Sequence, residues 1–160
     1  MSTVDFFAKR FAAELPAFNR VARALPADQL HYKPHEKNTP AGKLAWQIAV
    51  EMGALADLFK TGVHYFPHAP GPENIDDIAG TLEKNANDAL EALKGVDDAR
   101  WNGPGKAIFS EQAVWADKVY EMAWGFLLDM IHHRGQLSTY IRPMGGKVPS
   151  IYGPTADDAS

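Results

Sequence analysis

The sequence predicts an all-α protein folded as a four-helix bundle. Two observations support this prediction. Apolar residues recur every three or four positions in four separate stretches, and segments rich in glycine and proline lie between them. Helices that each carry one apolar stripe bury it against one another, so four of them form a bundle with room for a site between facing helices. The 160-residue chain fits one domain, residues 1–160, with a Gly- and Pro-rich tail at 145–160.

The first two helices are predicted from apolar spacing and from the positions of prolines. Residues 4–24 carry one apolar stripe, and Pro16 should bend or split this helix because proline lacks a backbone N–H and crowds the preceding turn. Thr39 and Pro40 indicate a helix start, since threonine caps free amides and proline suits the first helical position. The second helix should run to about Lys60.

Two further helices are predicted in the second half of the chain. The third covers residues 75–95, and the fourth runs from Asp117 to about Pro143. The segment before the third helix is predicted to be a loop, because glycine, proline and histidine are dense there. Between the last two helices the pattern weakens: residues 106–109 favour a short strand, and residues 110–115 favour a helical turn.

Composition and charge exclude several classes of partner. The net charge is −4 and the isoelectric point is near 5.8, with basic residues scattered along the chain. This pattern argues against nucleic-acid binding. No apolar run reaches the roughly 20 residues that span a bilayer, and the N-terminus lacks the basic and apolar regions of a secretory signal. We therefore expect a cytoplasmic protein that binds neither nucleic acid nor membrane.

The absence of cysteine limits the chemistry that the chain can perform by itself. Any metal ion must be held by nitrogen or oxygen ligands, and any thiol chemistry must use an external thiol. The sequence also contains no Gly-rich phosphate loop and no nucleophile elbow. The common nucleotide-binding and hydrolase classes therefore lose support.

Two pairs of polar residues interrupt the apolar stripes of the second and fourth helices. Asp129 and His133 are four residues apart, as are Gln47 and Glu51, so each pair meets on one helical face. Buried polar groups need partners. Two alternatives follow. The four side chains hold a divalent ion, or they form a hydrogen-bonded network that needs no ion.

The C-terminal motif resembles a known family. Residues 133–145 read HRGQLSTYIRPMG and residues 147–154 read KVPSIYGP, which is similar to the signature end of the DinB-like (damage-inducible, YfiT-like) superfamily of metalloenzymes. Residues 32–51 are similar to that superfamily's second-helix region. The resemblance implies an up-down-down-up four-helix bundle that is often a homodimer. It also implies a divalent metal held by three histidines, one from the second helix and two at i and i+4 on the last.

Carried across residue by residue, these three ligand positions fall on Gln47, Asp129 and His133, so this chain keeps one histidine of the three. Relatives include transferases and isomerases that use a thiol such as mycothiol, bacillithiol or glutathione. The resemblance therefore implies a nickel, zinc or iron ion and a small-molecule substrate or thiol.

Two hypotheses about function follow. In the first, the protein is a metal-dependent enzyme, with a thiol-dependent transferase as one reaction type, and His133 and Asp129 are its catalytic residues. Gln47, Asp129 and His133 would bind the metal, with Glu51 as a further ligand. In the second, the protein is a non-catalytic bundle that has lost the metal site and binds a small ligand or a protein partner.

Overall fold

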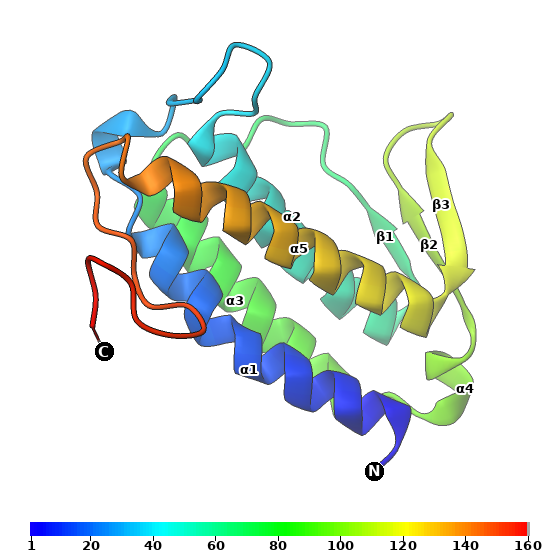
Figure 1. The fold of residues 1–160 in the computed structure, drawn as a ribbon. Coiled ribbons are helices and arrows are strands. Elements are labelled where there is room, and N and C mark those ends of the chain that lie inside the picture. The colour runs from blue at the N-terminus through cyan, green and yellow to red at the C-terminus, as the bar shows by residue number, and fades with distance from the viewer. Residues whose placement is uncertain (160) are drawn as a thin grey trace.

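Four long helices form the body of the molecule in a computed structural model that describes residues 1–159. Residue 160, the last of the predicted tail, lies outside the described residues. Figure 1 shows α1 and α5 running in one direction and α2 and α3 in the other, so α2 and α5 are antiparallel. The helices are α1 (Thr3–Arg23), α2 (Ala41–Lys60), α3 (Ile75–Leu93) and α5 (Val119–Ile141), with a short α4 (Asp98–Trp101) and a 3-10 turn η1 (Ala27–Gln29).

A three-stranded sheet corrects the all-α prediction. The strands are β1 (Val63–Tyr65), β2 (Pro104–Ile108) and β3 (Val114–Lys118), in the order β1-β2-β3. β1 is parallel to β2, with Val63 opposite Lys106, and β2 is antiparallel to β3. The sheet lies beside the end of the helical body where α5 begins (Figure 1). The protein is therefore mostly helical with a small sheet.

The strand expected at residues 106–109 is confirmed as part of β2, but the helical turn expected at residues 110–115 is wrong. The backbone N–H of Phe109 donates to the carbonyl of Ala113, which closes a turn between β2 and β3. β1 lay inside the predicted loop. It has three residues and pairs with a strand about 40 residues away, so local periodicity carries little signal for it.

The helix ends show which sequence signals were correct. Ser2 caps α1 in a reciprocal capping box with Asp5, and Asn74 caps α3. The cap predicted at Thr39 is wrong, because Pro40 holds the N-cap position of α2 and no side chain caps it. α1 continues through Pro16 as one helix, so this proline does not split it.

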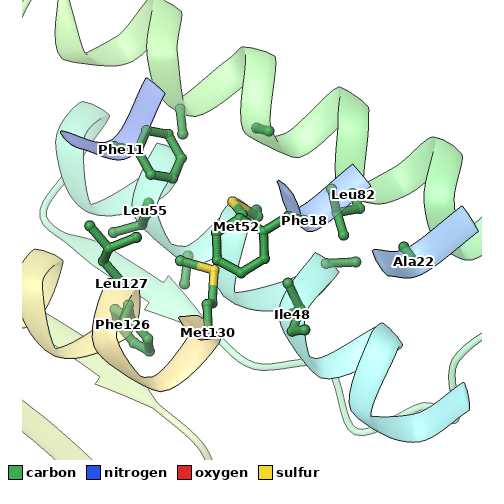
Figure 2. Packing of buried hydrophobic residues seen from close by; sticks show 14 of the residues in the cluster. Phe11, Phe18, Ala22, Ile48, Met52, Leu55, Leu82, Phe126, Leu127 and Met130 are labelled. Carbon is green, nitrogen blue, oxygen red and sulfur yellow. The ribbon is translucent and has the colours of Figure 1, made fainter. Parts of the chain in front are cut away.

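The apolar faces of the four long helices meet in one core. Figure 2 shows Phe11 and Phe18 of α1 lying against Met52 and Leu55 of α2, with α5 side chains close by. Leu55 and Met52 are fully buried. Burial of apolar surface stabilises the fold by about 25 cal/mol for each Å². It is the main force that holds these helices together. The core fixes the separation of α2 and α5, and this separation positions the polar residues described below.

The C-terminal segment is tied to the helices by a buried polar cluster. Arg134 of α5 is 2 % exposed, and its Nη1 donates to Glu14 Oε2 of α1 at 2.7 Å. The Tyr152 hydroxyl donates to the same carboxylate oxygen at 2.8 Å and accepts from Arg134 Nη2. Asp157 accepts from Arg142 and from the backbone of Val148. The Gly- and Pro-rich tail is therefore a strap that crosses α1 and α5.

No helix in residues 1–159 is both long enough and apolar enough to cross a membrane.

Truncating the core should be costly. We expect Leu55→Ala to lower the free energy of unfolding by about 2–5 kcal/mol, because the lost side chain leaves a cavity in a fully buried site. Leu128→Ala is the matched control, since Leu128 is 61 % exposed and should change stability by less than about 0.5 kcal/mol. Urea denaturation of both variants measures the difference, and equal effects would contradict the assignment of the core.

The buried ion pair gives a second prediction. Glu14→Gln should destabilise the protein by about 3–5 kcal/mol, because the Arg134 guanidinium would stay buried without a counter-charge. Arg10 also pairs with Glu14, but its side chain is 51 % exposed, so Arg10→Ala should cost less than about 1 kcal/mol. Urea denaturation again measures both variants. A Glu14→Gln protein as stable as the Arg10→Ala protein would show that the cluster contributes little.

Candidate metal centre

The structure brings Gln47 and Glu51 of α2 together with Asp129 and His133 of α5. Gln47 Nε2 donates to Glu51 Oε1 at 2.9 Å and lies 2.8 Å from His133 Nε2. His133 Nε2 also lies 3.2 Å from Asp129 Oδ2. Each pair spans one helical turn, and the two helices are antiparallel (Figure 1). Residue 47 of α2 therefore faces residue 133 of α5, and residue 51 faces residue 129.

Burial differs across these four side chains. Glu51 is 3 % exposed and the His133 side chain is 14 % exposed, whereas the Asp129 side chain is 48 % exposed. The buried carboxyl group thus lies at the inner end of the cluster, and Asp129 lies where solvent or a ligand can reach it. An open position beside a half-exposed ligand is typical of catalytic metal sites, which keep a place for water or substrate.

Gln136 determines which nitrogen of His133 carries the proton. His133 Nδ1 lies 2.8 Å from Gln136 Oε1, and an amide oxygen only accepts hydrogen bonds, so Nδ1 must donate. In the neutral ring, Nε2 then keeps its lone pair and points toward Gln47 and Asp129. Sequence reasoning placed Gln136 in the motif but missed this role. The i, i+3 spacing from His133 on a helix was the signal that could have found it.

Electron-rich atoms meet at the centre of the cluster. The lone pair of His133 Nε2 and the Asp129 carboxylate oxygen are 3.2 Å apart, and both are acceptors when the ring is neutral. Glu51 Oε2 is buried and has no hydrogen-bond partner. Such an arrangement is stabilised by positive charge between the acceptors, supplied by a proton or by a metal ion.

Burial raises the pKa of Glu51 to about 8, while the hydrogen bond from Gln47 opposes this rise; the charge of Asp129 and a hydrogen bond with its carboxylate add to it. Glu51 therefore holds its proton at neutral pH in the ion-free protein. A carboxyl group that is protonated without a cation and ionised beside one is suited to exchange a proton for a metal ion.

Three of these side chains have the spacing of a metal site. One ligand atom each from Glu51, Asp129 and His133 all lie within 4.8 Å of one another. Two carboxylate oxygens and one imidazole nitrogen suit a borderline divalent ion such as zinc, iron or nickel. The unpartnered Glu51 oxygen fits this use, because coordination would satisfy it. The residues present therefore fit a divalent cation.

Gln47 lies against this set with its amide nitrogen, and not its amide oxygen, toward Glu51 and His133. An amide nitrogen is a donor and has no free lone pair for a metal. The prediction that Gln47 is a metal ligand therefore remains a prediction, and ligation through Oε1 would require the amide to turn over.

A cavity of about 750 Å³ lies beside the cluster, and Gln47 is part of its wall. Trp46 and Phe66 contribute aromatic surface, and Lys43 and His31 contribute polar groups. The loop that closes one side lies close to the Trp46 ring, since a Cβ on Gly71 would be 2.4 Å from that ring. The cavity can therefore hold a small molecule next to the polar cluster.

Two other histidines and Arg134 are not part of the ligand set. His132 is exposed, and its ring is tilted against His133 at 5.4 Å between centroids. His64, expected in a loop, lies in β1 and is buried, with Nδ1 2.8 Å from Asp57 Oδ2. Arg134 is not at the site but in the buried cluster with Glu14. The partner of Arg134 comes from α1.

Comparisons with known proteins show what the chain resembles. Residues 126–160 match the model of the DinB family, which covers the second half of α5 and the strap. The chain is 26 % identical to the uncharacterized protein YrdA of Bacillus subtilis over 164 aligned positions, covering 98 % of this chain and 92 % of YrdA.

Solved structures share the fold. A DinB-like protein from Bacillus cereus superposes with a TM-score of 0.74 at 18 % identity, covering 91 % of this chain and 95 % of that one. A mycothiol-dependent maleylpyruvate isomerase superposes with a TM-score of 0.57 at 11 % identity, covering 91 % of this chain and 62 % of the isomerase. The chain thus resembles DinB-like proteins in its fold and in its C-terminal segment. The resemblance indicated by the C-terminal motif is confirmed.

The raised pKa of Glu51 predicts how stability depends on pH in chelator-treated protein. Between about pH 4.5 and 8 the folded chain keeps a proton that the unfolded chain has released, so stability should fall as pH rises through this window. Glu51→Gln removes this titration. It should match the wild type near pH 5 and exceed its free energy of unfolding at pH 8.5 by on the order of 3–5 kcal/mol.

Urea denaturation across this pH range is the measurement. Glu83→Gln provides the control, because the Glu83 side chain is 54 % exposed and should leave the pH profile of the wild type unchanged. Parallel profiles for the wild type and Glu51→Gln would show that Glu51 titrates normally.

Proposed function

We propose that the protein is a metal-dependent enzyme that acts on a small molecule, with the ion held by Glu51, Asp129 and His133. The observation that supports this most directly is the convergence of three ligand atoms within 4.8 Å, one of them on a residue with a buried, unpartnered carboxylate oxygen. The adjacent cavity of about 750 Å³ offers space for a substrate. We propose nickel, zinc or iron as the ion, because mixed nitrogen and oxygen donors suit these metals.

The substrate class that we favour includes an external thiol. The chain has no cysteine, so a thiol nucleophile must be brought by a cofactor or a substrate. The likeness to a mycothiol-dependent isomerase supports this idea at the level of the fold. A bound divalent ion supplies Lewis acidity and lowers the pKa of a coordinated thiol or water. A thiol-dependent transferase is the reaction type that combines these features.

The chain's own residues would then orient and move protons. Gln136 fixes the tautomer of His133, so the Nε2 lone pair faces the cluster and can serve as a ligand or as a base. Asp129, at 48 % exposure, lies where a substrate proton can be accepted. Glu51 stays inside the cluster, away from solvent. We further propose that the protein is a cytoplasmic homodimer that binds neither nucleic acid nor membrane.

One observation favours the alternative of a non-catalytic bundle that binds a small ligand or a protein partner. The hydrogen bonds of Gln47 to Glu51 and His133 close a polar network without an ion. In that case the cavity would bind a ligand without converting it to a product.

Metal analysis separates the two functions. Protein purified without a histidine tag should carry about one divalent ion per chain, and His133→Ala should lose at least roughly 100-fold in affinity, because it removes the only imidazole of the set. His132→Ala is the matched control, since this exposed neighbour is not part of the ligand set. Elemental analysis and calorimetric titration with zinc, nickel and ferrous ions measure both. A stable wild type that binds none of these ions would favour the non-catalytic bundle.

A further inference from the structure

We propose that Gln47 competes with a divalent ion at the metal centre, which we call its guard role. In the ion-free protein its amide donates hydrogen bonds to Glu51 and His133, and ion binding displaces the amide from the His133 lone pair that the ion needs. This inference rests on the proposed function, in which Glu51, Asp129 and His133 hold the ion. It assigns Gln47 a role as the competitor of the ion, in place of the ligand role that the family resemblance implies.

The geometry places one donor group between two residues of the proposed ligand set. Gln47 Nε2 lies 2.9 Å from Glu51 Oε1 and 2.8 Å from His133 Nε2, so its two N–H bonds can serve both acceptors at once. Because Gln136 fixes the His133 proton on Nδ1, the Nε2 atom must accept from Gln47. A lone pair that accepts a hydrogen bond from the amide is not free to coordinate an ion.

The competition persists if Gln47 binds the ion through its oxygen. Turning the amide over would bring Oε1 toward the cluster and would carry both N–H bonds away from Glu51 and His133. The hydrogen bond to His133 Nε2 is therefore lost whenever an ion takes the lone pair of that nitrogen.

The displaced amide has space to occupy. Gln47 lines the cavity of about 750 Å³ as well as the cluster, so rotation of its side chain moves the head group from one to the other. The ion-bound state would then present amide N–H groups to the cavity, where a ligand could accept them. Loss of the hydrogen bond to His133 Nε2 corresponds to an affinity penalty on the order of tenfold.

The test measures zinc affinity in chelator-stripped protein by calorimetric titration. Gln47→Leu and Gln47→Ala remove the amide, and the second variant guards against a leucine that blocks the site. Both should bind zinc at least roughly tenfold more tightly than the wild type. Val50→Ala alters the same cavity wall but keeps Gln47 and the three proposed ligands, so it should bind zinc with the affinity of the wild type, within about twofold.

Several outcomes would overturn the inference. Weaker zinc binding by both Gln47 variants would make the amide a ligand, and unchanged binding would make it a bystander. In the wild type, the side-chain amide resonances of Gln47 should shift in NMR spectra when zinc is added. Resonances that stay in place while zinc binds would also contradict displacement.

The two proposals can fail separately. If neither the wild type nor any variant binds zinc, nickel or ferrous ions, the proposed function fails and the guard role fails with it. If the wild type binds zinc and the Gln47 variants bind it no more tightly, only the guard role fails. If the Gln47 variants bind zinc and the wild type does not, the result supports the guard role most strongly.

Discussion

The antiparallel contact between α2 and α5 is the constraint on which the candidate site depends. Apolar residues of α2 and α5 lie together in the packed core (Figure 2), and this packing fixes the separation of the two helices that carry Glu51 and His133. Because the helices run in opposite directions, one helical turn on α2 matches one on α5. Two pairs at i, i+4 spacing therefore become a single cluster of four side chains.

Burial gives this cluster its chemical character. Away from water, a carboxyl group is held neutral and an unpaired lone pair is costly, so the site favours whatever supplies positive charge. In the ion-free protein, the raised pKa of Glu51 and its unpartnered oxygen both show that the site lacks positive charge. Gln47 partly compensates with a neutral donor, because its amide donates hydrogen bonds to Glu51 and His133. A divalent ion would supply the full positive charge. We therefore treat the amide and the ion as competitors.

The strap supports α5 from the opposite side. Arg134 follows His133 in the sequence but points to α1, where Glu14 and the Tyr152 hydroxyl satisfy its charge. One turn of α5 thus carries a residue of the candidate site on one face and a buried structural anchor on another. The family model covers both this helix and the strap, so the matched segment includes residues of each kind.

The sequence by itself determined the helical body, the four polar residues and their pairing along each helix, because 3.6-residue periodicity and i, i+4 spacing are local properties. Three features were decided only by tertiary structure. β1 exists because a distant strand pairs with it, Glu14 is buried because Arg134 reaches it, and the Gln47 amide faces Glu51 because α5 supplies His133 as a second acceptor. Each depends on contacts between segments far apart in the chain, which no local pattern encodes.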